Sequence, residues 1–129
     1  MERFKTFEEC CVYLGFDADT VIKPLAFYPE KDRNVLEAHA KRLIVTDAIN
    51  RQDNDGMEWF PDWGNLEEEK FQPWFDMGGS TGADFSHFDY DFWDSHSNSG
   101  SFLCFKTEDG MRHVVEYFGN LFKDEFLKK

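Results

Sequence analysis

The stretch from Leu66 to Lys106 constrains the fold of this chain most, because it contains three strand-like runs separated by glycine-rich turns. The second run, Ala83 to Asp94, alternates most clearly: rings occupy every other position of the segment 88–92 and predict one apolar face. The connections between the runs are too short for a crossover helix, so we expect antiparallel pairing. Pro73 cannot donate to a strand ladder, which places the first run, Glu67 to Met77, at an edge or a bulge.

Two helices are predicted before this stretch and one after it. Thr6 and Glu9 have the spacing of a capping box, in which the threonine hydroxyl accepts from the glutamate amide and the carboxylate reaches back to the threonine amide. Gly15 stands where a left-handed residue ends a helix. The second helix is predicted from Pro29 to Asn50. The last extends over Thr107 to Phe126, with a capping threonine and apolar residues at helical spacing.

The second helix has an apolar stripe that predicts which of its faces is buried. His39 falls within the stripe and is expected to be a core histidine with its hydrogen bonds satisfied. Basic side chains, Arg42 among them, are expected on the opposite, solvated face. The predicted buried face consists of Val35, Leu36, His39, Ala40, Leu43, Ile44 and Ala48.

Together these elements predict an α+β fold in a single domain that covers residues 1–129. Two N-terminal helices precede a three-stranded antiparallel β-meander, whose third strand is Ser101 to Lys106. The C-terminal helix is expected to pack on the sheet. Aromatic residues make up 18% of the chain, with fifteen phenylalanines, so rings are expected to fill most of the core.

The charge of the chain restricts its partners. The formal net charge of −12 argues against a nucleic-acid partner, because such proteins use Lys and Arg to neutralise phosphates. It argues equally against binding to an anionic membrane surface. It fits a protein partner with a basic surface. The chain itself is expected to be a monomer or a weak homodimer.

The cysteines and the N-terminal sequence indicate the cellular compartment. Cys10, Cys11 and Cys104 are a poor disulfide framework, because their number is odd and two are adjacent. The first residues lack the apolar segment of a signal peptide, and no window approaches the roughly 18 apolar residues of a membrane span. We therefore expect a cytoplasmic protein with reduced thiols that are buried as small hydrophobes.

One group of polar residues has the composition of a catalytic or metal site. His87, Asp89 and Asp91 alternate along the second strand run, so they are expected on one strand face. An imidazole and two carboxylates can hold a divalent metal or act as acid and base. Strand exteriors are ordinarily polar, so a solvated face is the preferred interpretation. The sequence contains no HExxH, CxxC or phosphate-binding glycine loop, and no cofactor is predicted.

The four tryptophans are the candidate binding residues. Trp59 and Trp63 follow the second helix in a predicted loop, where large rings either fold onto the core or line a binding groove. Trp74 and Trp93 belong to the first and second strand runs. Exposed tryptophans are frequent anchors of protein interfaces, whereas four buried tryptophans would leave the surface without such an anchor.

Five segments of the chain carry a family resemblance: FEECCVYLGFD, PEKDRNVLEAHAKRLIVTDAIN, a W-x3-W pair, KFQPWF and SFLCFKTEDGMRHVVEYFGNLFKDEF. They resemble a family of small uncharacterised proteins encoded by phages, prophages and mobile elements of Bacteroidetes-type gut bacteria. The resemblance covers nearly the whole chain and is most specific at Phe71 to Phe75 and at Leu103 to Lys106. The family usually has Arg before LCFK, where this chain has Phe102. The resemblance implies a role in a bacterial cytoplasm or a virion, and it implies no known activity.

These observations predict a non-enzymatic acidic interaction or accessory protein of a phage or mobile element. Its partner is expected to be a protein with a basic surface in the bacterial host cell. Two alternatives stay open: a metal-dependent or acid–base enzyme that uses His87, Asp89 and Asp91, and a structural component of a virion.

Overall fold

The computed structural model describes residues 2–65, 67–76, 86–93 and 103–127. Within these ranges the chain forms four α-helices, one short 3-10 helix and two strands. In chain order they are α1 (Phe7–Leu14), α2 (Ala18–Ile22), the 3-10 helix η1 (Lys23–Leu25), α3 (Glu30–Gln52), β1 (Lys70–Asp76), β2 (Ser86–Trp93) and α4 (Glu108–Phe126).

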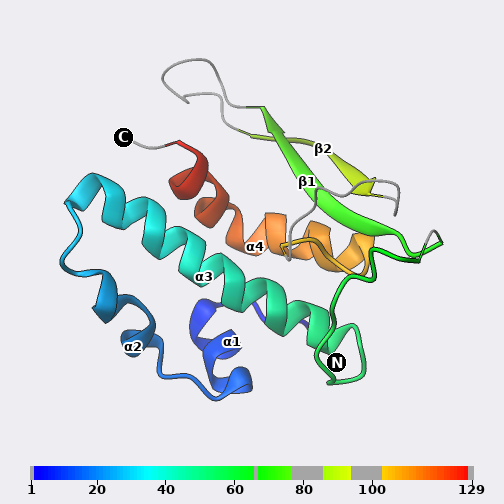
Figure 1. Ribbon diagram of the computed structural model, residues 1–129, viewed down its shortest axis with the longest axis horizontal. Coiled ribbons are helices and arrows are strands. Elements are labelled where there is room, and N and C mark those ends of the chain that lie inside the picture. The colour runs from blue at the N-terminus through cyan, green and yellow to red at the C-terminus, as the bar shows by residue number, and fades with distance from the viewer. Residues whose placement is uncertain (1, 66, 77–85, 94–102, 128–129) are drawn as a thin grey trace.

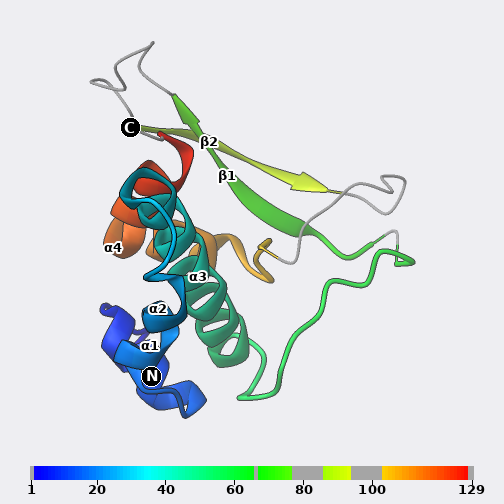
Figure 2. The same cartoon turned by 60° about the vertical axis from the view of Figure 1, so that its left-hand side comes forward.

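The two long helices, α3 and α4, lie side by side at the centre of the molecule (Figure 1). α1 and α2 pack against α3 on the side away from the strands. The ribbon of β1 and β2 lies beyond α4, and the turned view shows the same separation (Figure 2). The fold therefore has a helical centre with short helices on one side and a two-stranded ribbon on the other.

The structure is mostly helical, so the predicted α+β fold with a three-stranded meander is wrong. β1 and β2 pair antiparallel, with an irregularity between Trp74 and Phe75. The predicted third strand, Ser101 to Lys106, is described from Leu103 onward, and there it contributes one isolated bridge, Phe71 to Phe105. Alternating residues indicate strand propensity, but a ladder depends on a partner far away in the chain, and local alternation does not show how far pairing extends.

The C-terminal helix packs mainly along α3, so the expectation that it lies on a sheet is also wrong. Its contact with β1 runs through Phe75, whose ring centroid lies 4.8 Å from that of Phe122. α4 bends at Phe118, whose backbone leaves the helical region at φ −126° and ψ 19°. Gly119 follows the bend, and glycine is a common neighbour of helix kinks.

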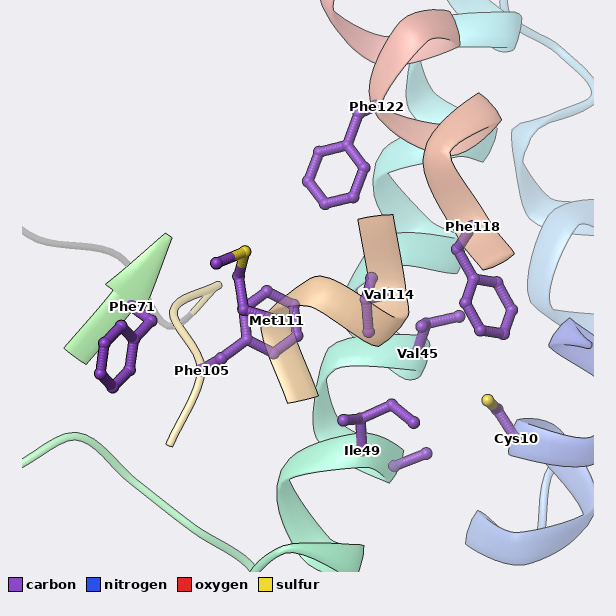
Figure 3. Close-up of a cluster of buried hydrophobic side chains, with 10 residues drawn as sticks. Cys10, Val45, Ile49, Phe71, Phe105, Met111, Val114, Phe118 and Phe122 are labelled. Carbon is purple, nitrogen blue, oxygen red and sulfur yellow. The ribbon is translucent and has the colours of Figure 1, made fainter. Parts of the chain in front are cut away.

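The hydrophobic core joins α1, α3, β1 and α4 (Figure 3). The predicted stripe of α4 is confirmed, since Met111, Val114, Phe118 and Phe122 are all buried in this core. Each large apolar side chain buried in this way contributes about 1.5–3 kcal/mol to stability. The buried cluster consists of Cys10, Val45, Ala48, Ile49, Phe71, Phe105, Met111, Val114, Phe118 and Phe122.

The predicted helix caps are present, with one change in a bonding partner. The Thr6 hydroxyl accepts from the Glu9 amide at 3.2 Å, as expected. The Glu9 carboxylate accepts from that same hydroxyl at 3.0 Å and not from the predicted Thr6 amide. Gly15 ends α1 in the left-handed region at φ 82°, and the Thr107 hydroxyl accepts from the Gly110 amide at 2.9 Å.

The buried face of α3 differs from the predicted one. Arg42, expected in solvent, is buried because its guanidinium makes two hydrogen bonds to Glu125, at 2.8 and 3.0 Å, and lies over the Phe122 ring. His39, expected in the core, has a side chain that is 44% exposed and bonds the same glutamate at 3.1 Å. Leu43 is exposed. The buried residues of α3 are Ala38, Arg42, Val45, Thr46, Ala48, Ile49 and Asn50.

Candidate protein-interaction groove

A groove opens on the surface between α3 and the segment that leaves its C-terminal end. Figure 2 shows this segment running from the end of α3 towards β1. We call the hollow the α3–loop groove, and its volume is about 160 Å³. It is lined by Leu43, Thr46, Asp47, Asn50, Glu58, Trp59, Phe60, Pro61 and Leu103.

Polar contacts hold the loop wall of the groove against α3. Arg51 bonds Asp47 one helical turn away, at 3.0 Å, and reaches Glu58 in the loop at 3.5 Å. The Asn54 side chain donates to the Met57 carbonyl at 3.1 Å, which organises the turn between helix and loop. Hydrogen bonds and ion pairs therefore hold both walls of the groove in place.

Asn50 fixes the third segment of the lining. Its amide donates to the Cys104 carbonyl, and its carbonyl accepts from the Lys106 amide, both at 3.0 Å. These two bonds tie the strand-like segment before α4 to α3 and so place Leu103 at the groove. Asn50 itself is buried, which makes both bonds more valuable than they would be in water.

Apolar side chains are exposed beside the groove. Met57 is 65% exposed and Phe60 is 63% exposed, and Leu43 on α3 is also exposed. The segment 53–69 that carries the loop contains seven Asp or Glu residues and no Lys or Arg. Exposed apolar side chains rimmed by like charges are typical of a surface that another macromolecule covers.

A buried hydroxyl lines the same groove. Thr46 is only 2% exposed, and its Oγ1 has no hydrogen-bond partner among the residues that the structure describes. Threonine hydroxyls within helices commonly bond the carbonyl one turn before them. Thr46 does not, so its buried hydroxyl is left without a hydrogen bond among the described residues.

The tryptophans proposed for binding have different positions. Trp59 is half-buried and lines the α3–loop groove. Trp63 is half-buried too, and the buried ammonium of Lys70 lies 5.1 Å from its ring centroid, an arrangement that ties the loop to β1. Trp74 and Trp93 belong to β1 and β2, and their side chains lie outside the described part of the structure.

The proposed metal or acid–base residues belong to β2. In the register, His87 is paired with Phe75 and Asp89 with Trp74, so the regular alternation is interrupted between them. The side chains of His87, Asp89 and Asp91 lie outside the described part, so the enzymatic alternative stays a prediction. The side chains that are described form no group of three or more His, Cys, Asp or Glu placed to hold a metal ion.

The three cysteines are buried and reduced, as expected. Burial raises the pKa of the Cys10 thiol to about 12, and burial likewise raises the pKa of Cys104 to about 12. Burial also raises the pKa of Cys11. Because the thiolate is the nucleophile, these raised pKa values disfavour nucleophilic chemistry at the three thiols at neutral pH.

Trp59, a binding candidate from the sequence, lines the groove, whereas the helix wall of the groove could not be predicted. Leu43 was assigned to the buried face of its helix, and nothing in the sequence distinguishes the Thr46 hydroxyl from an ordinary helical threonine. The only signal was indirect: the acidic loop with its rings had to lie against some neighbouring surface.

No protein-family model, curated protein or solved structure matches the chain. Among the described helices, none is both long and apolar enough to cross a membrane.

Proposed function

We propose that this protein is a non-enzymatic accessory protein of a phage or mobile element, and that it binds a basic protein surface through the α3–loop groove. The observation that carries the proposal is the exposure of Met57 and Phe60 beside a groove, within a segment that carries only acidic charges. The family resemblance of the sequence supports the phage or mobile-element context and the cytoplasm of a bacterial host.

The exposed apolar side chains of this surface would contribute most of the binding free energy. Protein interfaces place apolar and aromatic side chains at their centre and polar residues at their rim. Leu43, Met57 and Phe60 are the exposed apolar side chains here, and half-buried Trp59 stiffens the loop between them. A partner that covers them removes apolar area from water, which is the main favourable term in association.

The charged part of the surface supplies selectivity. Glu58 and Asp62 border the rings of the loop, and the whole chain carries a net charge of −12. Such a field attracts a basic partner, repels an acidic one and raises the association rate at low ionic strength. Binding should therefore weaken as salt is added, because exposed charges are screened.

A matched pair of variants tests the proposal. Phe60→Ser removes an exposed ring at the groove, and Phe27→Ser removes a ring that is 79% exposed in the connection before α3. The protein and both variants are immobilised, and proteins of a lysate from phage-carrying host cells are captured at low and high salt. We expect a basic protein that wild type and Phe27→Ser retain at low salt, with affinity for Phe60→Ser at least about tenfold lower.

Equal retention by the two variants would contradict a role for the groove. Retention that does not fall with salt would contradict the electrostatic part of the proposal. Both variants replace side chains in solvent, so equal thermal midpoints serve as the folding control.

A further inference from the structure

We infer that a second pocket, between the first half of α3 and the end of α4, binds a small molecule that carries one anionic group on an apolar body. The two helices run antiparallel, so the end of α4 lies beside the start of α3 (Figure 1). We call this hollow the lysine pocket, because Lys31, Lys41 and Lys123 line it. The inference goes beyond the proposed function, since the lysine pocket shares no lining residue with the α3–loop groove.

The lysine pocket is large enough for an organic molecule. Its volume is about 320 Å³, whereas an apolar cavity of about 150 Å³ already holds one benzene molecule. Sites for small organic ligands measure roughly 300–1,000 Å³, so this pocket falls at the lower end of their range. An inorganic ion alone would leave most of the space to water.

The three lysines supply positive charge that the protein leaves unpaired. Lys31, in the first turn of α3, is exposed, while Lys41 and Lys123 are half-buried. In the described part of the chain none of the three forms an ion pair, although the chain has 26 acidic and only 14 basic residues. An ammonium group that has lost part of its water without gaining a counter-charge is stabilised when an anion binds beside it.

Two carboxylates of the lining limit how much negative charge the ligand can carry. Glu37 and Asp124 also line the pocket, so its three lysines and two carboxylates give a formal charge of +1. Glu37 precedes Lys41 by four residues, a spacing at which ion pairs commonly form, yet the Lys41 ammonium lies instead 5.5 Å from the ring centroid of Phe7. One anionic group therefore suits the pocket, whereas the net charge of −12 repels a polyanion such as a nucleic acid.

The rest of the lining is apolar and suits the body of such a ligand. A ring or short alkyl group would cover these side chains, while the anionic group meets the lysines at one end. Lysine has a flexible four-carbon stem, so the ammonium groups of Lys31 and Lys123 can close over the anion, and the Asn34 amide can donate a further hydrogen bond. The apolar lining consists of Val35, Ala38, Leu121 and Leu127.

Three probes that share parts of one structure test the inference. Phenyl phosphate has a ring and an anionic group, inorganic phosphate has the anionic group alone, and benzyl alcohol has the ring without charge. Binding is followed at constant ionic strength by NMR, through the methyl signals of Val35 and Leu121. We expect phenyl phosphate to bind at least about fivefold more tightly than inorganic phosphate, because its ring leaves water. It should exceed benzyl alcohol by a similar factor, because only the phosphate meets the lysines.

Substitutions of single lysines identify the groups responsible. Lys31→Met and Lys123→Met keep most of the apolar stem and remove the charge, so each should weaken phenyl phosphate binding about 2–10-fold, the range of one net hydrogen bond. Neither should change the affinity for benzyl alcohol. Lys23→Met is the matched control, because it removes the same charge from an exposed lysine of η1 that does not line the pocket. Equal thermal midpoints of the variants and wild type serve as the folding control.

The outcomes decide the inference without touching the proposed function. Equal affinity of wild type for phenyl phosphate and inorganic phosphate overturns it, and so does the absence of binding by all three probes. An affinity for phenyl phosphate that neither Lys31→Met nor Lys123→Met lowers, or that Lys23→Met lowers as much, overturns it as well. The proposed function depends on the capture experiment with Phe60→Ser at the other end of α3, so each of the two proposals can fail alone.

Discussion

Arg42 and Thr46 lie one turn apart on α3, and both are buried polar residues, yet their surroundings differ. Arg42 faces α4, where Glu125 takes two hydrogen bonds from its guanidinium and two phenylalanine rings cover it. Thr46 belongs to the lining of the α3–loop groove, and its buried hydroxyl has no partner among the described residues. Buried polar groups in folded proteins are nearly always bonded, so Arg42 follows the usual pattern and Thr46, one turn further along the helix, departs from it.

Asn50, the next polar residue along this line of the helix, is an intermediate case. It lines the groove, but both ends of its side-chain amide are already hydrogen-bonded, to the Cys104 carbonyl and the Lys106 amide. Its role is therefore to hold the fold together. The three residues form a series: Arg42 makes a buried ion pair, Asn50 makes two neutral hydrogen bonds, and the Thr46 hydroxyl makes none. The stability lost on substitution should fall in the same order.

Arg42→Ala should give the largest loss. It leaves the largely buried Glu125 with His39 as its remaining hydrogen-bond partner among the described residues, and breaking one side of a buried ion pair lowers the free energy of unfolding by about 3–5 kcal/mol. Urea unfolding measures the loss. The double variant Arg42→Met, Glu125→Leu removes both charges and should lose much less, because no buried charge is left unpaired. A double variant as unstable as the single one would show that the ion pair is not the cause.

Asn50→Ala should give a smaller loss. It leaves the Cys104 carbonyl and the Lys106 amide without their bonds, so the free energy of unfolding should fall by about 1–3 kcal/mol. The segment before α4 should also open more often, and alkylation of Cys104 should accelerate relative to Cys10 in α1. Mass spectrometry of the labelled peptides at pH 8 measures the ratio. An unchanged ratio would mean that Asn50 does not hold this segment.

Thr46→Val should give the smallest change, with the opposite sign. The substitution removes a hydroxyl that bonds nothing in the described structure, so the free energy of unfolding should stay the same or rise by up to about 1 kcal/mol. The same urea experiment measures it. A loss comparable to that of Asn50→Ala would show that the hydroxyl has a structural partner and would remove the difference between Thr46 and the bonded polar residues of α3.

The features that could be predicted from the sequence are those that depend on near neighbours in the chain. Thr6, Gly15 and Thr107 mark helix ends because their partners lie within four residues. The buried stripe of α4 could be predicted because its apolar residues follow helical spacing without polar interruption.

The features that could not be predicted depend on partners far away in the chain. Hydrophobic periodicity predicts that Leu43 is buried and Arg42 exposed. The residues near Arg42 in the sequence give no sign that its partner is Glu125, which lies in another helix. Phe105 has the surroundings of a strand residue, but its pairing stops after one bridge to Phe71. Predicting the groove requires both kinds of information. The rings and acidic charges of its loop wall can be read from the sequence, whereas its helix wall follows only from the tertiary structure.

The bridge between Phe71 and Phe105 has a consequence for how such a chain can vary. This pair joins the two ends of the excursion that the backbone makes from the helical centre, through two hydrogen bonds of 3.0 and 2.8 Å. Closing a longer excursion is cheap, since doubling its length costs only about 0.6 kcal/mol. Insertions or deletions between Phe75 and Leu103 should leave the helices and the groove in place, because the contacts that this stretch's ends make with α4 and α3 lie outside it. Lengths in this stretch are therefore free to diverge among descendants of the same gene while the α3–loop groove persists.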